Sequence, residues 1–248
     1  SGEKIQIEFI SANPVGPMNV VNARAGALGD SLARIFEYCG AEVSREYYIN
    51  DHGIQVHTLG RSIEARYIEL LGGEVDFPTE GYQGEYVREL AEELITAKGR
   101  SLLALNEAER IEFCQDWGYQ RILASQQRDL ADYGIIYDHW FSERKLHQSG
   151  AVEDVARRME EKGLLYLEDG AVWFHSTDFG DDKDRVLRTA DGRTTYFTAD
   201  IAYHLNKIER GFSHLINIWG PDHHGYISRM KAAMIALGFD PEIGRAHV

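Results

Sequence analysis

One stretch near the start of the chain, residues 5–30, restricts the possible folds more than any other. Residues 5–9 alternate between apolar and polar side chains, as in a strand, and a loop rich in Pro and Gly follows. After Asn22 the apolar residues fall three or four apart, which predicts a helix with one apolar face. This face comprises Ala25, Leu28, Leu32, Ile35 and Phe36. A strand, a tight loop and a helix in this order fit an anion-binding helix N-terminus, and they also fit an ordinary turn without a ligand.

Strands and helices then alternate in both outer parts of the chain. A strand at 41–49 precedes a helix at 54–71, and a continuous apolar strand at 214–219 precedes a helix at 226–237. This alternation predicts a parallel α/β sheet, in which ligands bind at the carboxyl ends of the strands. Between the two halves we predict an α+β insertion. Its expected elements are helices at 85–98, 107–133 and 151–162, a short strand at 135–140, and hairpins at 164–174 and 185–197.

Composition excludes some functional classes. The 248 residues include 40 acidic and 26 basic ones, a net charge of −14, which argues against a protein that coats nucleic acid. No apolar run reaches membrane-spanning length and no secretory signal opens the sequence, so we expect a cytoplasmic protein. Cys39 and Cys114 fit no zinc or redox spacing, and we expect both to be small buried side chains.

Polar residues gather in three places that the predicted sheet would bring together: around Glu8, around Asp200 and after the strand at 214–219. Taken alone, Asp200 would be interpreted as a helix N-cap. The adjacent His223 and His224 suggest a metal site, but neighbouring side chains point in different directions and no third ligand has suitable spacing, so we expect no bound metal. The acidic loop at 178–184 lacks calcium-loop spacing and is expected to be a solvated turn.

Several blocks in a fixed order resemble arginyl-tRNA synthetase, a class I aminoacyl-tRNA synthetase, from Lys4 to about Glu242. The blocks include EFISANPVGP, GDSLARIFEYCGAEVSREYYINDHG, VWFHSTDFGDDKDRVLRTADG, TYFTADIAYHLNKIE and WGPDHHGYISRMKAA. Other class I synthetases share the first strand, loop and helix, but not TYFTAD or FGDDKDRVL. The resemblance implies a Rossmann-like parallel sheet split by an α+β insertion. It also implies that L-arginine is activated with ATP and Mg²⁺ and then transferred to tRNA(Arg).

The resemblance also assigns roles to individual positions. The positions that match the arginine site are Glu8, Ser11, Asn13, Tyr196, Asp200 and His223. The positions that match the ATP site are Pro17, Asn19, Val21, Asn22, Gly220, Asp222 and His223. Carboxylates such as Glu8 and Asp200 suit arginine because a guanidinium is planar, always charged and best held by paired acceptors. The chemistry needs no protein nucleophile, since the arginine carboxylate attacks the α-phosphorus of ATP.

The chain departs from the family at its best-known motif. Where most members carry His-x-Gly-His, residues 19–22 are Asn-Val-Val-Asn. The resemblance makes Asn19 and Asn22 the catalytic positions, but an amide donates hydrogen bonds without a positive charge. Val21 places a branched side chain where the family glycine lets adenine approach the backbone. Two interpretations stay open: a working variant, and an arginine-binding paralogue that has lost ATP activation.

We predict that residues 1–72 and 194–242 are the two halves of the catalytic domain, and that 73–193 is the insertion. The end, EIGRAHV, reads like a translated sequencing adapter, so we expect 243–248 to be a non-native tail. The family's signature loop and anticodon-binding domain would come after residue 242, and we therefore expect poor catalysis by this chain alone. We expect a monomer. A generic nucleotide-binding module is the remaining alternative, but the sequence lacks the glycine-rich phosphate fingerprints.

Overall fold

The chain forms two compact units in a computed structural model that describes residues 2–220, 225–240 and 245–247. The first, here called the sheet unit, comprises Ser1–Ser11, Ala23–Tyr48 and Tyr137–Val248. The second, the helical unit, comprises Ala12–Asn22 and Ile49–Ile136. The domain division predicted at residues 72, 193 and 242 stays a prediction.

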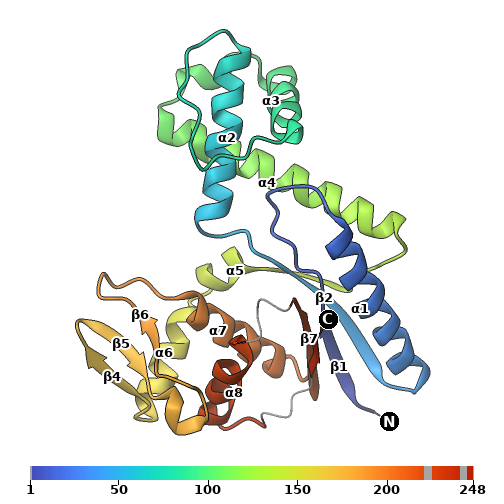
Figure 1. Ribbon diagram of the computed structural model, residues 1–248, viewed down its shortest axis with the longest axis vertical. Coiled ribbons are helices and arrows are strands. Elements are labelled where there is room, and N and C mark those ends of the chain that lie inside the picture. The colour runs from blue at the N-terminus through green and yellow to red at the C-terminus, as the bar shows by residue number, and fades with distance from the viewer. Residues whose placement is uncertain (1, 221–224, 241–244, 248) are drawn as a thin grey trace. The chain divides into compact units, whose positions relative to one another are not determined.

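A five-stranded sheet in the order β3-β2-β1-β7-β8 organises the sheet unit, and its strands β1, β2 and β7 are labelled in Figure 1. Its strands are β1 (Lys4–Glu8), β2 (Glu42–Ile49), β3 (His139–Ser142), β7 (His214–Trp219) and β8 (Arg245–His247). The central strand β1 pairs in parallel with β2 and with β7, and β7 pairs in parallel with β8. This confirms the predicted parallel α/β sheet. The strand predicted at 135–140 instead lies at His139–Ser142, next to β2.

Helix α1 (Val20–Tyr38) is most deeply buried at small residues. Its buried positions are Gly26, Gly29 and Ala33, whereas Ile35 is 59 % exposed and Leu28 is also exposed. The predicted apolar face is thus only partly correct: Ala25, Leu32 and Phe36 are half-buried, whereas Leu28 and Ile35 are exposed. The reason is the close approach of the helix to Phe9, since a Cβ on Gly29 would lie 2.2 Å from the Phe9 ring.

The sheet unit also contains a second, antiparallel sheet in the order β4-β5-β6. Its strands are β4 (Leu165–Glu168), β5 (Ala171–Phe174) and β6 (Arg185–Arg188), and the 3₁₀ turn η2 (Ser176–Phe179) connects the last two. The helices of this part are α5 (Glu143–Gln148), α6 (Ala151–Glu161), α7 (Tyr196–Glu209) and α8 (Tyr226–Leu237). The strand predicted up to residue 197 does not form, because Thr194 makes only an isolated bridge to Arg188 and α7 begins at Tyr196.

The helical unit is built from α2 (Ile54–Leu70), α3 (Glu85–Lys98), the 3₁₀ turn η1 (Ser101–Ala104) and α4 (Glu107–Asp132). Helices α2 and α4 meet where glycines leave room: a Cβ on Gly118 would lie 2.3 Å from Ile63 Cδ1. Asn106 caps α4 in a reciprocal capping box with Glu109. The predicted helices at 54–71, 85–98 and 107–133 thus form, with α4 ending one residue early and α2 likewise.

Only one of the two cysteines behaves as the sequence predicted. Cys114 is buried in the core of the helical unit, whereas Cys39 is exposed just after α1. None of the helices that the structure describes combines the length and the apolar character needed to cross a bilayer.

Candidate active site

Glu8, the last residue of β1, lies at the centre of a buried polar network in the sheet unit. The chain turns sharply just after it, because Ile10 and Ser11 both adopt positive φ angles, which residues with a side chain rarely do. The turn brings the Ser11 hydroxyl back to donate to Glu8 Oε1 at 3.0 Å, and Ser11 in turn accepts from the Tyr48 amide at 3.0 Å. Two predicted site residues, Glu8 and Ser11, are thus in direct contact.

The other oxygen of Glu8 is occupied by a lysine that sequence reasoning missed. Lys207 is fully buried, and its Nζ donates to Glu8 Oε2 and to Asn217 Oδ1, each at 2.7 Å. Its ammonium also lies 4.1 Å from the centre of the Tyr203 ring. One signal was present in the sequence: Lys207 follows Asp200 by seven positions, two helical turns, and so lies on the same face of α7.

Asp200, in α7, is half-buried and accepts a hydrogen bond from the Tyr226 hydroxyl. Burial raises the pKa of Asp200 to about 7, and the nearby Glu8 carboxylate adds to the rise, although the Tyr226 hydrogen bond and Lys207 oppose it. Asp200 is not the N-cap of its helix, which is Thr195. A carboxyl group with this pKa can ionise readily when a cation binds beside it.

A third carboxylate, Glu143, belongs to the same cluster and was not predicted. Burial raises the pKa of the Tyr48 hydroxyl strongly, and the charges of Glu143, Asp200 and Glu8 raise it further. Glu143 is itself buried, in the first turn of α5, and is hydrogen-bonded to Tyr48. Three carboxylates therefore lie near one phenol. No sequence signal marked Glu143, because an acidic residue after the Ser142 N-cap is typical of any helix start.

His204 links the network to its own helix. Its Nδ1 pairs with the Asp200 carbonyl at 2.8 Å and its Nε2 with the Asn217 amide at 3.0 Å. Burial lowers the pKa of His204 to about 3, so the imidazole is neutral at physiological pH. Tyr196, by contrast, is 65 % exposed at the start of α7 and does not join the buried cluster.

The remaining predicted residues of the first loop lie in the helical unit. Asn13 donates from Nδ2 to Gln55 Oε1 at 2.6 Å. Asn19 precedes α1, and its Oδ1 accepts from the amides of Val21 and Asn22 at 2.9 and 3.1 Å. Asn22 Oδ1 accepts from the Asn19 amide at 3.0 Å. The two asparagines thus form a reciprocal cap that uses N–H groups at the start of the helix.

Residues 19–22 thus cap the start of their own helix with neutral amide side chains. The Asn19 side chain occupies two amides at the helix end where an anion would otherwise be bound. Val21 is 69 % exposed, so its branched side chain projects from the first turn of α1. Gly220 follows β7 directly and is exposed, while the predicted Asp222 and His223 lie outside the described residues.

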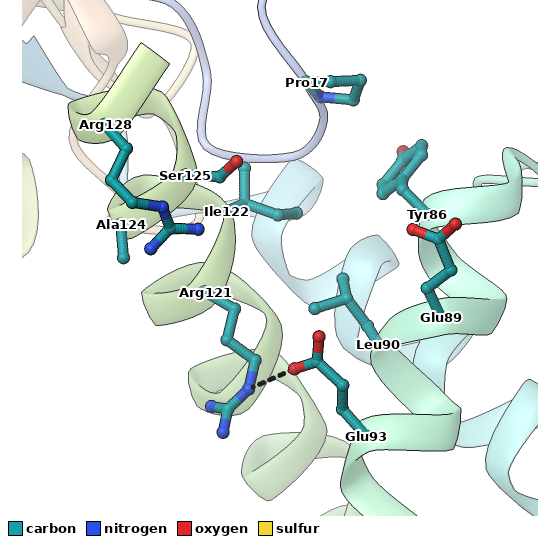
Figure 2. A pocket seen from close by; sticks show the side chains of 10 residues that line it. All are labelled: Pro17, Tyr86, Glu89, Leu90, Glu93, Arg121, Ile122, Ala124, Ser125 and Arg128. Carbon is teal, nitrogen blue, oxygen red and sulfur yellow. Dashed lines mark hydrogen bonds and ion pairs between the residues drawn. The ribbon is translucent and has the colours of Figure 1, made fainter. Parts of the chain in front are cut away.

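A cavity of about 340 Å³ opens in the helical unit between α3, α4 and Pro17 (Figure 2). Glu89 and Glu93 line it from α3, and Arg121 and Arg128 from α4, with an ion pair of 3.0 Å between Arg121 and Glu93. In the part of the chain that the structure describes, no group of three or more His, Cys, Asp or Glu side chains is arranged to hold a metal ion.

Comparison with known proteins assigns the chain to a family. The model of the class I tRNA synthetase catalytic domain of the arginine (R) type matches residues 1–247. The arginine–tRNA ligases of Oceanobacillus iheyensis and Geobacillus kaustophilus are 48 % and 49 % identical to the chain over 242 residues. These matches cover 98 % of the chain but only 44 % and 43 % of the relatives.

Solved structures agree with this assignment. A Campylobacter jejuni structure assigned as an arginyl-tRNA synthetase superimposes with a TM-score of 0.91 at 38 % identity, covering all of the chain and 54 % of that protein. The Thermus thermophilus arginyl-tRNA synthetase shares the fold, with a TM-score of 0.73 at 20 % identity, covering all of the chain and 48 % of that protein. The chain spans about half the length of the proteins it matches, and it belongs to the catalytic-domain family of the class I arginyl-tRNA synthetases.

Proposed function

We propose that the sheet unit binds the guanidinium group of L-arginine with Glu8, Asp200 and Glu143. The observation that carries this proposal is the cluster of three carboxylates around Tyr48 in a chain of the arginyl family. A guanidinium presents five N–H donors in a plane and needs several acceptors arranged around it. Each carboxylate already has a partner in the chain, namely Lys207 for Glu8, Tyr226 for Asp200 and Tyr48 for Glu143, so the guanidinium would use their remaining acceptor lone pairs.

The other predicted arginine ligands complete this proposal. Ser11, Asn13, Tyr196 and His223 are assigned by their match to the family positions, with Asn13 and His223 toward the amino-acid backbone of arginine. The support from contacts is strongest for Ser11, whose hydroxyl touches Glu8. Tyr196 is exposed and would have to contact arginine from the solvent side.

We further propose that the protein containing this chain is an ATP-dependent arginine–tRNA ligase. The arginine carboxylate attacks the α-phosphorus of ATP, pyrophosphate leaves, and arginyl-adenylate forms. The terminal ribose hydroxyl of tRNA(Arg) then attacks the arginyl carbonyl and AMP leaves. The protein orients the reactants and stabilises charge, while Mg²⁺ enters with the ATP phosphates. The nucleotide site would comprise Pro17, Asn19, Val21, Asn22, Gly220, Asp222 and His223.

A second function has a specific observation in its favour. The reciprocal cap of Asn19 and Asn22 occupies amides that an ATP phosphate would use. A relative of the synthetases that binds arginine without activating it would tolerate this closed helix end. Titration calorimetry separates the two functions in a full-length protein that carries this segment: arginine binding together with ATP binding supports the ligase, and arginine binding alone supports the second function.

The arginine pocket can be tested on the same protein with citrulline. Citrulline replaces the charged guanidinium by a neutral ureido group, which leaves buried carboxylates without a cationic partner. We expect citrulline to bind at least about tenfold more weakly than arginine. Equal affinities would show that the carboxylate cluster is not the arginine site.

Arginine-dependent ATP–pyrophosphate exchange by the isolated chain should be weak, and robust turnover would contradict that expectation.

A further inference from the structure

The loop that carries Asn13 is held by side chains from two helices of the helical unit. Gln126 of α4 is only 1 % exposed, and its Nε2 donates to the carbonyls of Asn13 and Gly16 at 3.2 and 3.0 Å. Tyr86 of α3 donates from its hydroxyl to the carbonyl between them, that of Val15, at 2.7 Å. Three carbonyls within four consecutive residues thus accept hydrogen bonds from the helices.

Packing holds the loop at two residues, since Pro14 is buried and Val15 packs against the core of the helical unit. Pro17, which follows the bonded carbonyls, lines the cavity between α3 and α4, and Tyr86 lines the same cavity (Figure 2). Pro17 therefore lies beside open space rather than within a close-packed core. Inside the loop the Val15 amide donates to the Asn13 carbonyl at 2.8 Å. The hydrogen bonds from Gln126 and Tyr86 therefore restrain the loop carbonyls in addition to this packing and to the bond from Asn13 to Gln55.

The restraint matters because of what lies at the two ends of the loop. Asn13, at one end, is a proposed arginine ligand, and Asn19 and Asn22, just past the other end, are the proposed nucleotide positions. A shift of the loop would move both sets of groups together. A displacement of 1 Å in a substrate-positioning group is enough to reduce catalysis strongly.

We propose that Gln126 and Tyr86 are positioning residues for arginine activation, acting through the loop from Asn13 to Gly16. The inference rests on the proposed ligase function. It gives the helices of the insertion a role in the reaction that the family match does not assign. Neither side chain needs to touch arginine or ATP for this role.

The test uses variants that remove only the donated hydrogen bonds. Gln126→Glu keeps the size of the side chain but replaces the donor by an acceptor, and Tyr86→Phe removes one hydroxyl. Tyr67→Phe is the matched control, because the Tyr67 hydroxyl also donates to a backbone carbonyl at 2.7 Å in the same unit, that of Gly99, far from the loop in sequence.

Two measurements are made on a full-length protein that carries this segment. In ATP–pyrophosphate exchange we expect Gln126→Glu to raise the KM for arginine about tenfold and Tyr86→Phe about threefold, while Tyr67→Phe changes it less than about twofold. In hydrogen exchange we expect the amides of residues 13–22 to exchange faster in the two loop variants than in the control. Thermal unfolding of Tyr86→Phe should match that of Tyr67→Phe.

The outcomes separate this inference from the function on which it rests. If the unmodified protein shows no arginine-dependent ATP–pyrophosphate exchange, the ligase function fails. Amide hydrogen exchange alone then decides whether the two residues hold the loop. Unchanged amide exchange at residues 13–22 in Tyr86→Phe and Gln126→Glu would overturn the inference. The inference would also be overturned if neither loop variant raised the KM for arginine more than Tyr67→Phe does. If Gln126→Glu does not fold, Tyr86→Phe still decides.

Discussion

Lys207 and Glu8 are 199 positions apart in the sequence, yet Lys207 Nζ lies 2.7 Å from Glu8 Oε2 in the interior of the sheet unit. The pair joins α7 to the carboxyl end of β1, and Asn217 of β7 shares the same ammonium. A buried ion pair of this kind contributes little net stability, but loss of one partner leaves the other charge buried and unpaired.

Replacement of Lys207 by Met should therefore destabilise the chain severely. We expect Lys207→Met to lower the free energy of unfolding by about 3–5 kcal/mol. Lys4→Met is the control, because Lys4 forms an exposed pair of 3.6 Å with Glu42 and should cost less than about 1 kcal/mol. Urea denaturation measures both. The double variant Glu8→Gln/Lys207→Met should recover part of the lost free energy of unfolding. If Lys207→Met destabilised the chain no more than Lys4→Met does, this explanation would be contradicted.

Stability should also depend on the ionisation of Asp200. Its pKa of about 7 in the folded chain lies above the ordinary aspartate value, so between about pH 4 and 7 the folded state holds a proton that the unfolded state has lost. Asp200 therefore makes the free energy of unfolding fall as the pH rises through this window. This fall in the free energy of unfolding between about pH 4 and 7 should be absent in Asp200→Asn. It should persist in the control Asp191→Asn, which changes an exposed residue. An identical pH slope in all three proteins would show that Asp200 does not titrate there.

Arginine affinity should change with pH in the opposite sense. Only the ionised carboxylate of Asp200 pairs with a guanidinium, and its ionised fraction rises about tenfold between pH 6 and 8 for a pKa of about 7. We expect the Kd for arginine to fall by up to about tenfold over this range, with release of a proton on binding at pH 6. Calorimetry in buffers of different ionisation enthalpy detects that proton. Binding without proton release would place the guanidinium elsewhere.

Most of the parallel sheet could be predicted from the sequence, but little of the buried polar network could. The strands β1 and β7 and the helices α3 and α8 follow from local periodicity, which depends only on neighbouring residues. Glu8 and Asp200 came from the family resemblance. Lys207, the partner of Glu8, did not, because its spacing from Asp200 places both on one face of α7 but does not predict a contact with β1.

The face of α1 shows the same limit in another form. Periodicity placed Leu28 and Ile35 toward the sheet, but the contact surface is set by how closely the helix axis approaches Phe9. A close approach selects glycine and excludes large apolar residues. Likewise, Glu143 is an ordinary first-turn acid in the sequence and joins the candidate site only through the tertiary position of α5.

The contact between Gly29 and Phe9 should tolerate no added methyl group. A Cβ at Gly29 would lie 2.2 Å from the Phe9 ring, so Gly29→Ala must displace the helix or the ring. We expect a loss of about 1–3 kcal/mol in the free energy of unfolding, against less than about 0.5 kcal/mol for Ala27→Ser at an exposed position of α1. Addition of Phe9→Leu to Gly29→Ala should be less harmful than the sum of the two single changes. Simple additivity would contradict this explanation.

Restoration of the family motif should open the nucleotide site. In Asn19→His/Val21→Gly/Asn22→His the reciprocal cap is lost, two side chains that can carry positive charge face the helix end, and the branched side chain at 21 is removed. If residues 19–22 hold the ATP phosphates, the KM for ATP in arginine-dependent pyrophosphate exchange should fall about tenfold or more, since charged donors bind phosphate more strongly than neutral amides. Val20→Ile, at the variable position of the motif, is the control and should leave that KM unchanged. A triple variant that binds ATP no better than the original protein would show that the Asn-Val-Val-Asn sequence does not limit ATP binding.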